Sequence, residues 1–307
     1  MGLQLELAGQ PKDLGGGFLV RRLLPSAKRQ GVGPFLFMDH FGPVTVEPGA
    51  VHDVRAHPHI GLATVTYLFE GAMMHRDSLG CMQRIEPGAI NWMTAGRGIV
   101  HSERAPEDMR NQRYVNHGLQ LWAALPQAFE ETDPAFVHTP AAALPEVLVG
   151  DARVRVLIGE AFGARSPVVT FCPTVYLDIQ LKPGSSIDLP PLAQELGVYA
   201  IDNGFTLDGA AIAAQVLAVL KPGEACHIAS AGGCRLMVLG GEPLDAPRFM
   251  WWNFVSSRKE RIAQAAQDWS AHAFGYVVGD DEIIPLPERR EVRERRTRRR
   301  APPDRRD

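Results

Sequence analysis

The sequence lacks several features that would place it in well-known classes. No uninterrupted apolar run approaches the roughly eighteen residues that a membrane-spanning helix needs, and the N-terminus has no basic start followed by an apolar stretch. Only four cysteines are present, and none shares a CxxC spacing. These absences argue against a membrane protein, a zinc knuckle and a thioredoxin-like site, and they favour a cytoplasmic protein with reduced thiols.

Positive charge is also scarce outside one segment. The net charge is −3, yet residues 288–307 alone hold ten arginines against five acidic residues, so the rest of the chain is clearly acidic. An acidic body argues against a broad nucleic-acid-binding surface, because phosphate contacts need clustered cations. The Arg-rich segment has no aromatic residue for base stacking, so we expect it to be a disordered tail and not a nucleic-acid contact.

Helical periodicity is rare as well, whereas turn residues are frequent. Thirty Gly and 24 Pro separate short runs of β-branched, aromatic or alternating apolar residues, such as residues 63–69, 118–123 and 153–158. This pattern is typical of many short strands joined by turns, and it predicts an all-β fold. A second series of strands begins near residue 175, and only residues 255–272 have the period of an amphipathic helix.

The length of 307 residues is sufficient for two domains. We expect a metal-binding barrel over residues 1–140, a barrel without a metal site over residues 141–287, and the tail over residues 288–307. The absence of a long apolar edge strand or a heptad repeat favours a monomer.

Two short motifs carry potential metal ligands. His57-Pro-His59 and His101-Ser-Glu103 each place two ligand-type side chains one residue apart. Because residues i and i+2 of a strand point to the same face, two such strands side by side would bring three imidazoles and one carboxylate together. This set extends the two-His, one-carboxylate pattern of non-haem Fe(II) sites, in which open positions accept substrate or dioxygen. Residue types alone do not separate iron from other divalent metals.

Neighbouring residues supply candidates for a substrate pocket. We expect Phe37, Met38, Val100 and Gln120 to line its wall, with the Gln120 amide available for a hydrogen bond to substrate or to metal-bound water. His40 is a further candidate for the pocket, whereas Asp39 is expected to form a turn.

These motifs, together with Gly33-Pro-Phe-Leu-Phe-Met-Asp39 and Met93-Thr-Ala-Gly-Arg-Gly98, resemble the pirin family of the cupin superfamily. The resemblance implies a bicupin fold, with two face-to-face β-barrels and metal in the N-terminal barrel only. It also implies iron ligation by His57, His59, His101 and Glu103. The chain departs from many pirins at Ile60 and Ala63, where an Arg and a Glu are common, which changes the polarity near the site.

The resemblance and the ligand set predict an Fe(II)-dependent dioxygenase that acts on quercetin-like flavonols or related enol aromatics, with Glu103 as the general base. The alternative is a non-catalytic, iron-dependent redox sensor that binds a protein partner in transcription. A metal-assisted isomerase also stays open, because cupin barrels support many reactions.

Overall fold

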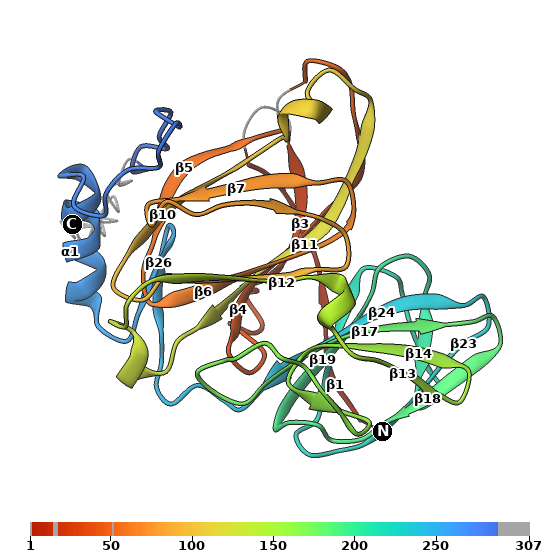
Figure 1. The fold of residues 1–307 in the computed structure, drawn as a ribbon. Helices are drawn as coiled ribbons and strands as arrows, with labels where there is room; N and C mark the ends of the chain where they lie inside the picture. The colour runs from red at the N-terminus through yellow and green to blue at the C-terminus, as the bar shows by residue number, and fades with distance from the viewer. Residues whose placement is uncertain (1, 15–17, 51, 288–307) are drawn as a thin grey trace, which may run out of the picture.

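The computed structural model describes residues 2–14, 18–50 and 52–287, and this part of the chain is built almost entirely from antiparallel β-sheet. The strands form two barrels joined side by side (Figure 1). The all-β, bicupin prediction is therefore confirmed. None of the described helices is both long and apolar enough to cross a membrane. The Arg-rich segment 288–307 lies outside the described residues.

The first barrel consists of a seven-stranded sheet that faces a four-stranded sheet. In spatial order the larger sheet contains β12 (Ala135–Thr139), β9 (Ile90–Thr94), β6 (Leu62–Glu70), β11 (Tyr114–Ala124), β4 (Phe35–Val46), β3 (Leu19–Leu24) and β2 (Gln10–Asp13). The smaller sheet contains β5 (Val54–His59), β10 (Ile99–Arg104), β7 (Met73–Asp77) and β8 (Met82–Ile85).

The second barrel repeats this plan with a seven-stranded and a four-stranded sheet. Its larger sheet contains β1 (Leu3–Ala8), β22 (Val216–Leu220), β19 (Glu195–Ala200), β24 (Cys234–Gly241), β17 (Thr174–Leu181), β14 (Ala152–Ile158) and β13 (Glu146–Val149). Its smaller sheet contains β18 (Ser185–Leu189), β23 (Cys226–Ser230), β20 (Phe205–Leu207) and β21 (Ala210–Ile212).

Several short elements lie between these strands or follow the second barrel. They are the 3-10 turns η1 (Glu107–Met109), η2 (Gln127–Phe129) and η3 (Ala141–Ala143), and the strand pairs β15 (Glu160–Ala161) with β16 (Ala164–Arg165) and β25 (Phe249–Trp251) with β26 (Phe254–Ser256). The helix α1 covers Lys259–Ser270, a shorter span than the expected 255–272 because residues 254–256 are strand β26.

Each end of the described chain crosses to the other barrel. β1 pairs with β22 in the large sheet of the second barrel, although the residues that follow it build the first barrel. At the opposite end, β26 and α1 lie against the first barrel, and Figure 1 shows α1 (blue) beyond the strands β5 and β10. Phe254 bridges to Ile60, and Ile283 bridges to Ala56. The first barrel is therefore completed by residues that follow the second barrel in the chain.

The large sheet of the first barrel is buried on both faces. One face packs against the second barrel in a shared core that includes Met38, Tyr67, Tyr176 and Tyr199. The other face is directed into the first barrel, where Phe37 and Trp122 belong to a separate cluster. Burial on both faces explains why residues 35–41 are buried without interruption. The interior of the second barrel is a continuous apolar core.

Candidate metal centre and pocket

Three histidines converge on the inner face of the four-stranded sheet in the first barrel. His57 lies directly opposite His101 in the register of β5 and β10, and His59 follows two residues later on the same face of β5. The ring centroids of His57 and His101 are 4.4 Å apart, and those of His59 lie 4.9 and 5.1 Å from the other two. One ring nitrogen of each lies within 4.8 Å of the others, which is a spacing that a single metal ion can bridge.

Hydrogen bonds fix the tautomers of two of these rings. A main-chain carbonyl can only accept, so Nδ1 of His57 donates to the carbonyl of Arg55 at 2.8 Å, and Nδ1 of His59 donates to the carbonyl of Asn253 at 3.2 Å. The Nε2 lone pair of each ring is then available. Both ring nitrogens of His101 are buried without a hydrogen-bond partner among the described residues. Metal-bound histidines characteristically donate their second ring nitrogen to a carbonyl or carboxylate, as His57 and His59 do here. A buried imidazole without a partner beside them fits a third ligand, because buried polar groups are normally satisfied.

Burial disfavours the protonated form of all three imidazoles. Burial lowers the pKa of His57 to about 4, an effect that the hydrogen bond to Arg55 partly opposes. Burial and the neighbouring rings lower the pKa values of His59 and His101 well below the ordinary value. A neutral imidazole keeps the lone pair that a metal ion needs. This donor set suits zinc, copper, iron and nickel alike.

The glycine that follows the first motif is required by the fold. Gly61 has a φ of +67°, and a Cβ atom at this position would lie 2.0 Å from the carbonyl oxygen of Val255. The close approach lets the main chain of Val255 donate to the carbonyl of Ile60 at 3.2 Å. The hairpin β25–β26 is thereby held next to the histidines, where the carbonyl of Asn253 reaches His59.

Glu103 lies on the same face of β10 as His101 but outside the three-histidine cluster. Its Oε1 is 3.5 Å from the hydroxyl of Thr66. Burial of the carboxyl group raises the pKa of Glu103 to about 7, while the contact with Thr66 acts in the opposite direction. Ligation of the metal by Glu103 and its role as general base stay predictions.

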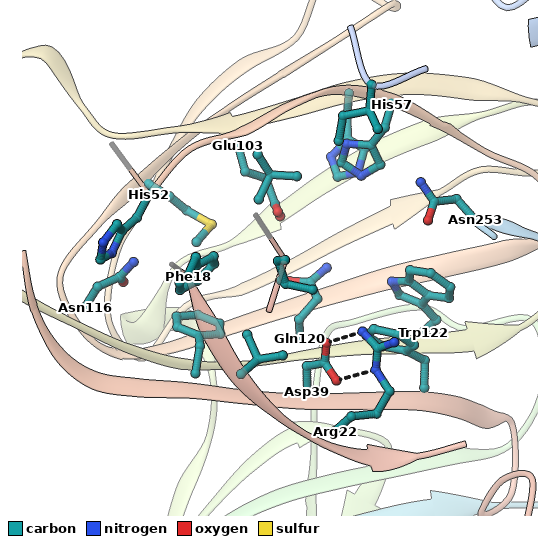
Figure 2. A pocket seen from close by; sticks show the side chains of 18 of the residues that line it. Phe18, Arg22, Asp39, His52, His57, Glu103, Asn116, Gln120, Trp122 and Asn253 are labelled. Atoms are coloured by element: carbon teal, nitrogen blue, oxygen red, sulfur yellow. Dashed lines mark hydrogen bonds and ion pairs between the residues drawn. The ribbon is translucent and has the colours of Figure 1, made fainter. Parts of the chain in front are cut away.

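A pocket of about 470 Å³ opens from the histidine centre into the first barrel. Figure 2 shows His57 and Glu103 on one side of it, with Gln120, Trp122, Asp39 and Arg22 opposite. Phe37 and Trp122 stack with ring centroids 4.0 Å apart and planes inclined by 10°. The ring centroids of Trp122 and His59 are 5.0 Å apart, with the two planes inclined by 76°. The wall beside the histidines is therefore aromatic.

Two of the four residues expected in the pocket wall line it. Phe37 and Gln120 do so, whereas Met38 belongs to the core between the barrels and Val100 packs against α1 on the outer face of β10. Met38 and Val100 therefore face away from this pocket. Both differences follow from strand alternation, which directs successive side chains to opposite faces.

The same alternation reverses the expectations for two neighbouring residues. Asp39 lies inside β4 and lines the pocket, so the prediction that it forms a turn is wrong. His40 points to the other face, where its Nδ1 hydrogen-bonds the hydroxyl of Tyr199 in the second barrel at 2.7 Å. Sequence reasoning also missed Arg22, Trp122 and Asn253. The i, i+2 pattern of Phe37, Asp39 and Phe41 was the available signal for an inward face.

The comparisons with known proteins agree with this structure. The chain matches the Pirin family model over residues 17–123 and the Pirin C-terminal cupin domain model over residues 176–275. A pirin-like protein of Caulobacter vibrioides is 45% identical over 93% of this chain and 100% of its own length. A protein of Pseudomonas aeruginosa with the provisional name quercetin 2,3-dioxygenase is 38% identical over 86% of this chain and 82% of its own.

A solved structure shows the same likeness in three dimensions. The quercetin 2,3-dioxygenase of Acinetobacter baumannii superposes with a TM-score of 0.84 at 37% identity, covering 94% of this chain and 96% of that one. The fold and the site define a bicupin protein whose first barrel contains a candidate three-histidine metal centre. More narrowly, the chain belongs to the pirin family.

Proposed function

We propose that the protein is an Fe(II)-dependent dioxygenase that acts on quercetin-like flavonols or related enol-bearing aromatics. The observation that carries the proposal is the convergence of three buried imidazoles at an aromatic-walled pocket of about 470 Å³. This volume lies within the usual range for small-molecule sites. The 37% identical structural neighbour that is named quercetin 2,3-dioxygenase supports the reaction class.

In such a reaction on a flavonol, both atoms of dioxygen enter the ring-opened product, two carbon–carbon bonds of the enol ring break, and the carbon between them leaves as carbon monoxide. The electron-rich substrate supplies the electrons, so no further reductant is consumed. When bound, Fe(II) would supply Lewis acidity toward the enol hydroxyl and a place for dioxygen. The ion would be held in a fixed position by His57, His59 and His101.

The protein's own groups have separate tasks. The stacked rings of Phe37 and Trp122 flank the substrate and exclude water. Glu103, with its pKa raised to about 7 by burial, takes the enol proton at a carboxylate oxygen. Thr66 keeps that carboxyl group beside the pocket. Replacement of Glu103 by Gln is expected to abolish turnover while some iron stays bound.

The test combines metal analysis with oxygen uptake. Purified protein is loaded with Fe(II), and dioxygen consumption is followed with quercetin present. We expect stoichiometric iron and rapid uptake, with both lost in His57→Ala and kept in His227→Ala, whose ring is exposed in the second barrel. Iron without uptake would contradict the dioxygenase and leave the redox-sensing alternative.

Metal identity requires its own comparison. Metal-free protein reconstituted separately with Fe(II), Ni(II), Zn(II) and Mn(II) should consume dioxygen with quercetin only in the Fe(II) form. Equal or faster dioxygen uptake with another ion would contradict iron as the metal of the reaction.

The compartment, the oligomeric state and a protein partner are further proposals. All four cysteines are free thiols, which supports a reducing compartment such as the cytoplasm. The monomeric state stays a prediction that size-exclusion chromatography with light scattering would check. The protein partner stays a prediction that a pull-down in both iron oxidation states would check.

A further inference from the structure

A row of polar side chains crosses the pocket-facing side of the large sheet in the first barrel. Thr66 on β6 lies opposite Gln120 on β11, Gln120 lies opposite Asp39 on β4, and Asp39 lies opposite Arg22 on β3. Directly opposed residues of antiparallel strands point to the same face, so all four side chains share one face. Three of them line the pocket, and the fourth, Thr66, contacts Glu103.

At one end of the row, the polar groups are arranged beside the histidine centre. The hydroxyl of Thr66 donates to Oε1 of Gln120 at 2.8 Å. The amide oxygen of Gln120 is thus occupied, and no described residue accepts a hydrogen bond from its Nε2. Gln120 therefore presents a donor to the middle of the pocket, as its position in Figure 2 indicates.

At the other end, Arg22 and Asp39 form a two-pronged ion pair. Nε and Nη2 of Arg22 donate to the two carboxylate oxygens of Asp39 at 2.9 and 2.7 Å (Figure 2). The guanidinium also lies over the ring of Phe37 at 4.4 Å from its centroid. No described residue accepts from Nη1 of Arg22. Its side chain is 25% exposed, whereas that of Asp39 is 3% exposed.

This ion pair is suited to one kind of ligand group. Asp39 offers acceptor oxygens and Arg22 offers the Nη1 donor, while their charges cancel. A ligand carboxylate would meet repulsion from Asp39, and a ligand ammonium would meet repulsion from Arg22. A hydroxyl group, which donates and accepts at once, matches both partners. The adjacent rings of Phe37 and Trp122 provide an aromatic surface for the group that carries this hydroxyl.

Strand spacing sets the distance between the two ends of the row. Thr66 and Asp39 are separated by two strand spacings, which is about 10 Å. Because Thr66 contacts Glu103, the pair of Arg22 and Asp39 lies about two strand spacings along the sheet from the side chain that meets Glu103.

We propose that Arg22 and Asp39 form a recognition subsite for a phenolic hydroxyl on the far ring of an aromatic substrate whose near end lies at the histidine centre. The inference rests on the proposed function for the placement of the near end. It narrows the substrate class to planar aromatics that carry a hydroxyl group on the ring farther from the reacting oxygen. Arg22 and Asp39 have no other assigned role in the reaction.

The test measures binding without turnover. Fe(II)-loaded protein is titrated under anaerobic conditions with quercetin and with the matching flavonol that lacks both hydroxyls on the phenyl ring, and tryptophan fluorescence reports the Kd. The unmutated protein should bind quercetin about ten- to a hundredfold more tightly, as expected for a hydrogen bond to a charged group. Equal affinities, or no binding of either compound, would overturn the proposal.

Variants then assign the preference to the ion pair. Asp39→Asn should reduce the ratio of the two Kd values to about threefold or less. Because a single replacement of Arg22 would leave a buried unpaired carboxylate, the second variant is the double replacement Arg22→Met with Asp39→Leu. Arg21→Met is the matched control, since Arg21 is exposed on the other face of β3, and it should keep the full ratio. A ratio that survives in both pocket variants would also overturn the proposal.

Oxygen uptake by the same samples separates this inference from the proposed function. Tighter binding of quercetin without dioxygen uptake would support the subsite and contradict the dioxygenase. Dioxygen uptake with equal Kd values for the two flavonols would support the dioxygenase and contradict the subsite.

Discussion

Nδ1 of His59 donates a hydrogen bond to the main-chain carbonyl of Asn253, 3.2 Å away and 194 positions later in the chain. A candidate metal ligand of the first barrel is thus oriented by a hairpin that follows the second barrel. Hydrogen bonds of this kind fix the ring orientation and the tautomer of a metal-bound histidine. The metal centre therefore depends on the correct docking of β25 and β26.

Gly61→Ala is expected to loosen this hairpin. The added Cβ would lie 2.0 Å from the carbonyl oxygen of Val255, and the φ of +67° disfavours alanine. Backbone strain alone costs about 1–3 kcal/mol, and the loss of ring orientation should weaken metal binding by about tenfold or more. Chemical denaturation and metal titration would measure both effects. Gly150→Ala is the control, since its φ is +58° and its Cβ would meet nothing within 4 Å. Unchanged metal affinity in Gly61→Ala would contradict the role of the hairpin.

Metal binding should stabilise the fold through the three histidines. An ion that binds only the native state at a hundred times its Kd adds about 2.7 kcal/mol to the free energy of unfolding. Thermal unfolding with and without Fe(II) should therefore show a higher Tm with metal in the unmutated protein and no shift in His101→Ala. His138→Ala, which alters a ring on β12 away from the cluster, should keep the shift. A shift that persists in His101→Ala would place the bound metal elsewhere.

Substitutions of Met38 and Phe37 should distinguish an effect on folding stability from an effect on ligand binding. Met38 is fully buried between the barrels, so Met38→Ala is expected to lower the free energy of unfolding by about 2–5 kcal/mol. Because its side chain points away from the pocket, iron content and ligand affinity should not change. Phe37→Ala should weaken ligand binding as well, because Phe37 stacks on Trp122 in the pocket wall. Urea denaturation and fluorescence titration would measure the two effects, and a loss of iron in Met38→Ala would contradict the assignment.

His40 should make the fold sensitive to acid. Burial lowers its pKa to about 3, with smaller contributions from His117 and Arg21, whereas an unfolded histidine titrates near 6.5. The unfolded state therefore binds a proton that the native state refuses, so stability is full above pH 6.5 and falls as the pH decreases toward 3.

Replacing His40 by Gln should remove this contribution. The slope of unfolding free energy against pH between 6 and 4 should decrease by up to about 1.4 kcal/mol per pH unit, measured by denaturation at each pH. Identical slopes in the unmutated protein and His40→Gln would show that His40 does not remain neutral in the native state.

Local patterns were sufficient for part of this protein. The spacing of His57 and His59 and that of His101 and Glu103 placed each pair on one face of a strand, because strand geometry has a period of two. Turn residues at short intervals predicted the sheet-rich fold, because a turn is likewise specified by a few neighbouring residues. The faces of Met38 and Val100 were misjudged, although alternation from Phe37 and His101 directs both of them outward.

What the sequence determined by itself is the class of fold, the three convergent histidines and the helix near the C-terminus, since each depends on local periodicity or short spacing. Only the tertiary structure decided that Asn253 holds His59, that β1 completes the second barrel, and that Arg22 meets Asp39 across the pocket. These relationships join strands whose pairing order follows from the burial of whole sheet faces. That burial is a property of the assembled barrels, and no single segment of the chain encodes it.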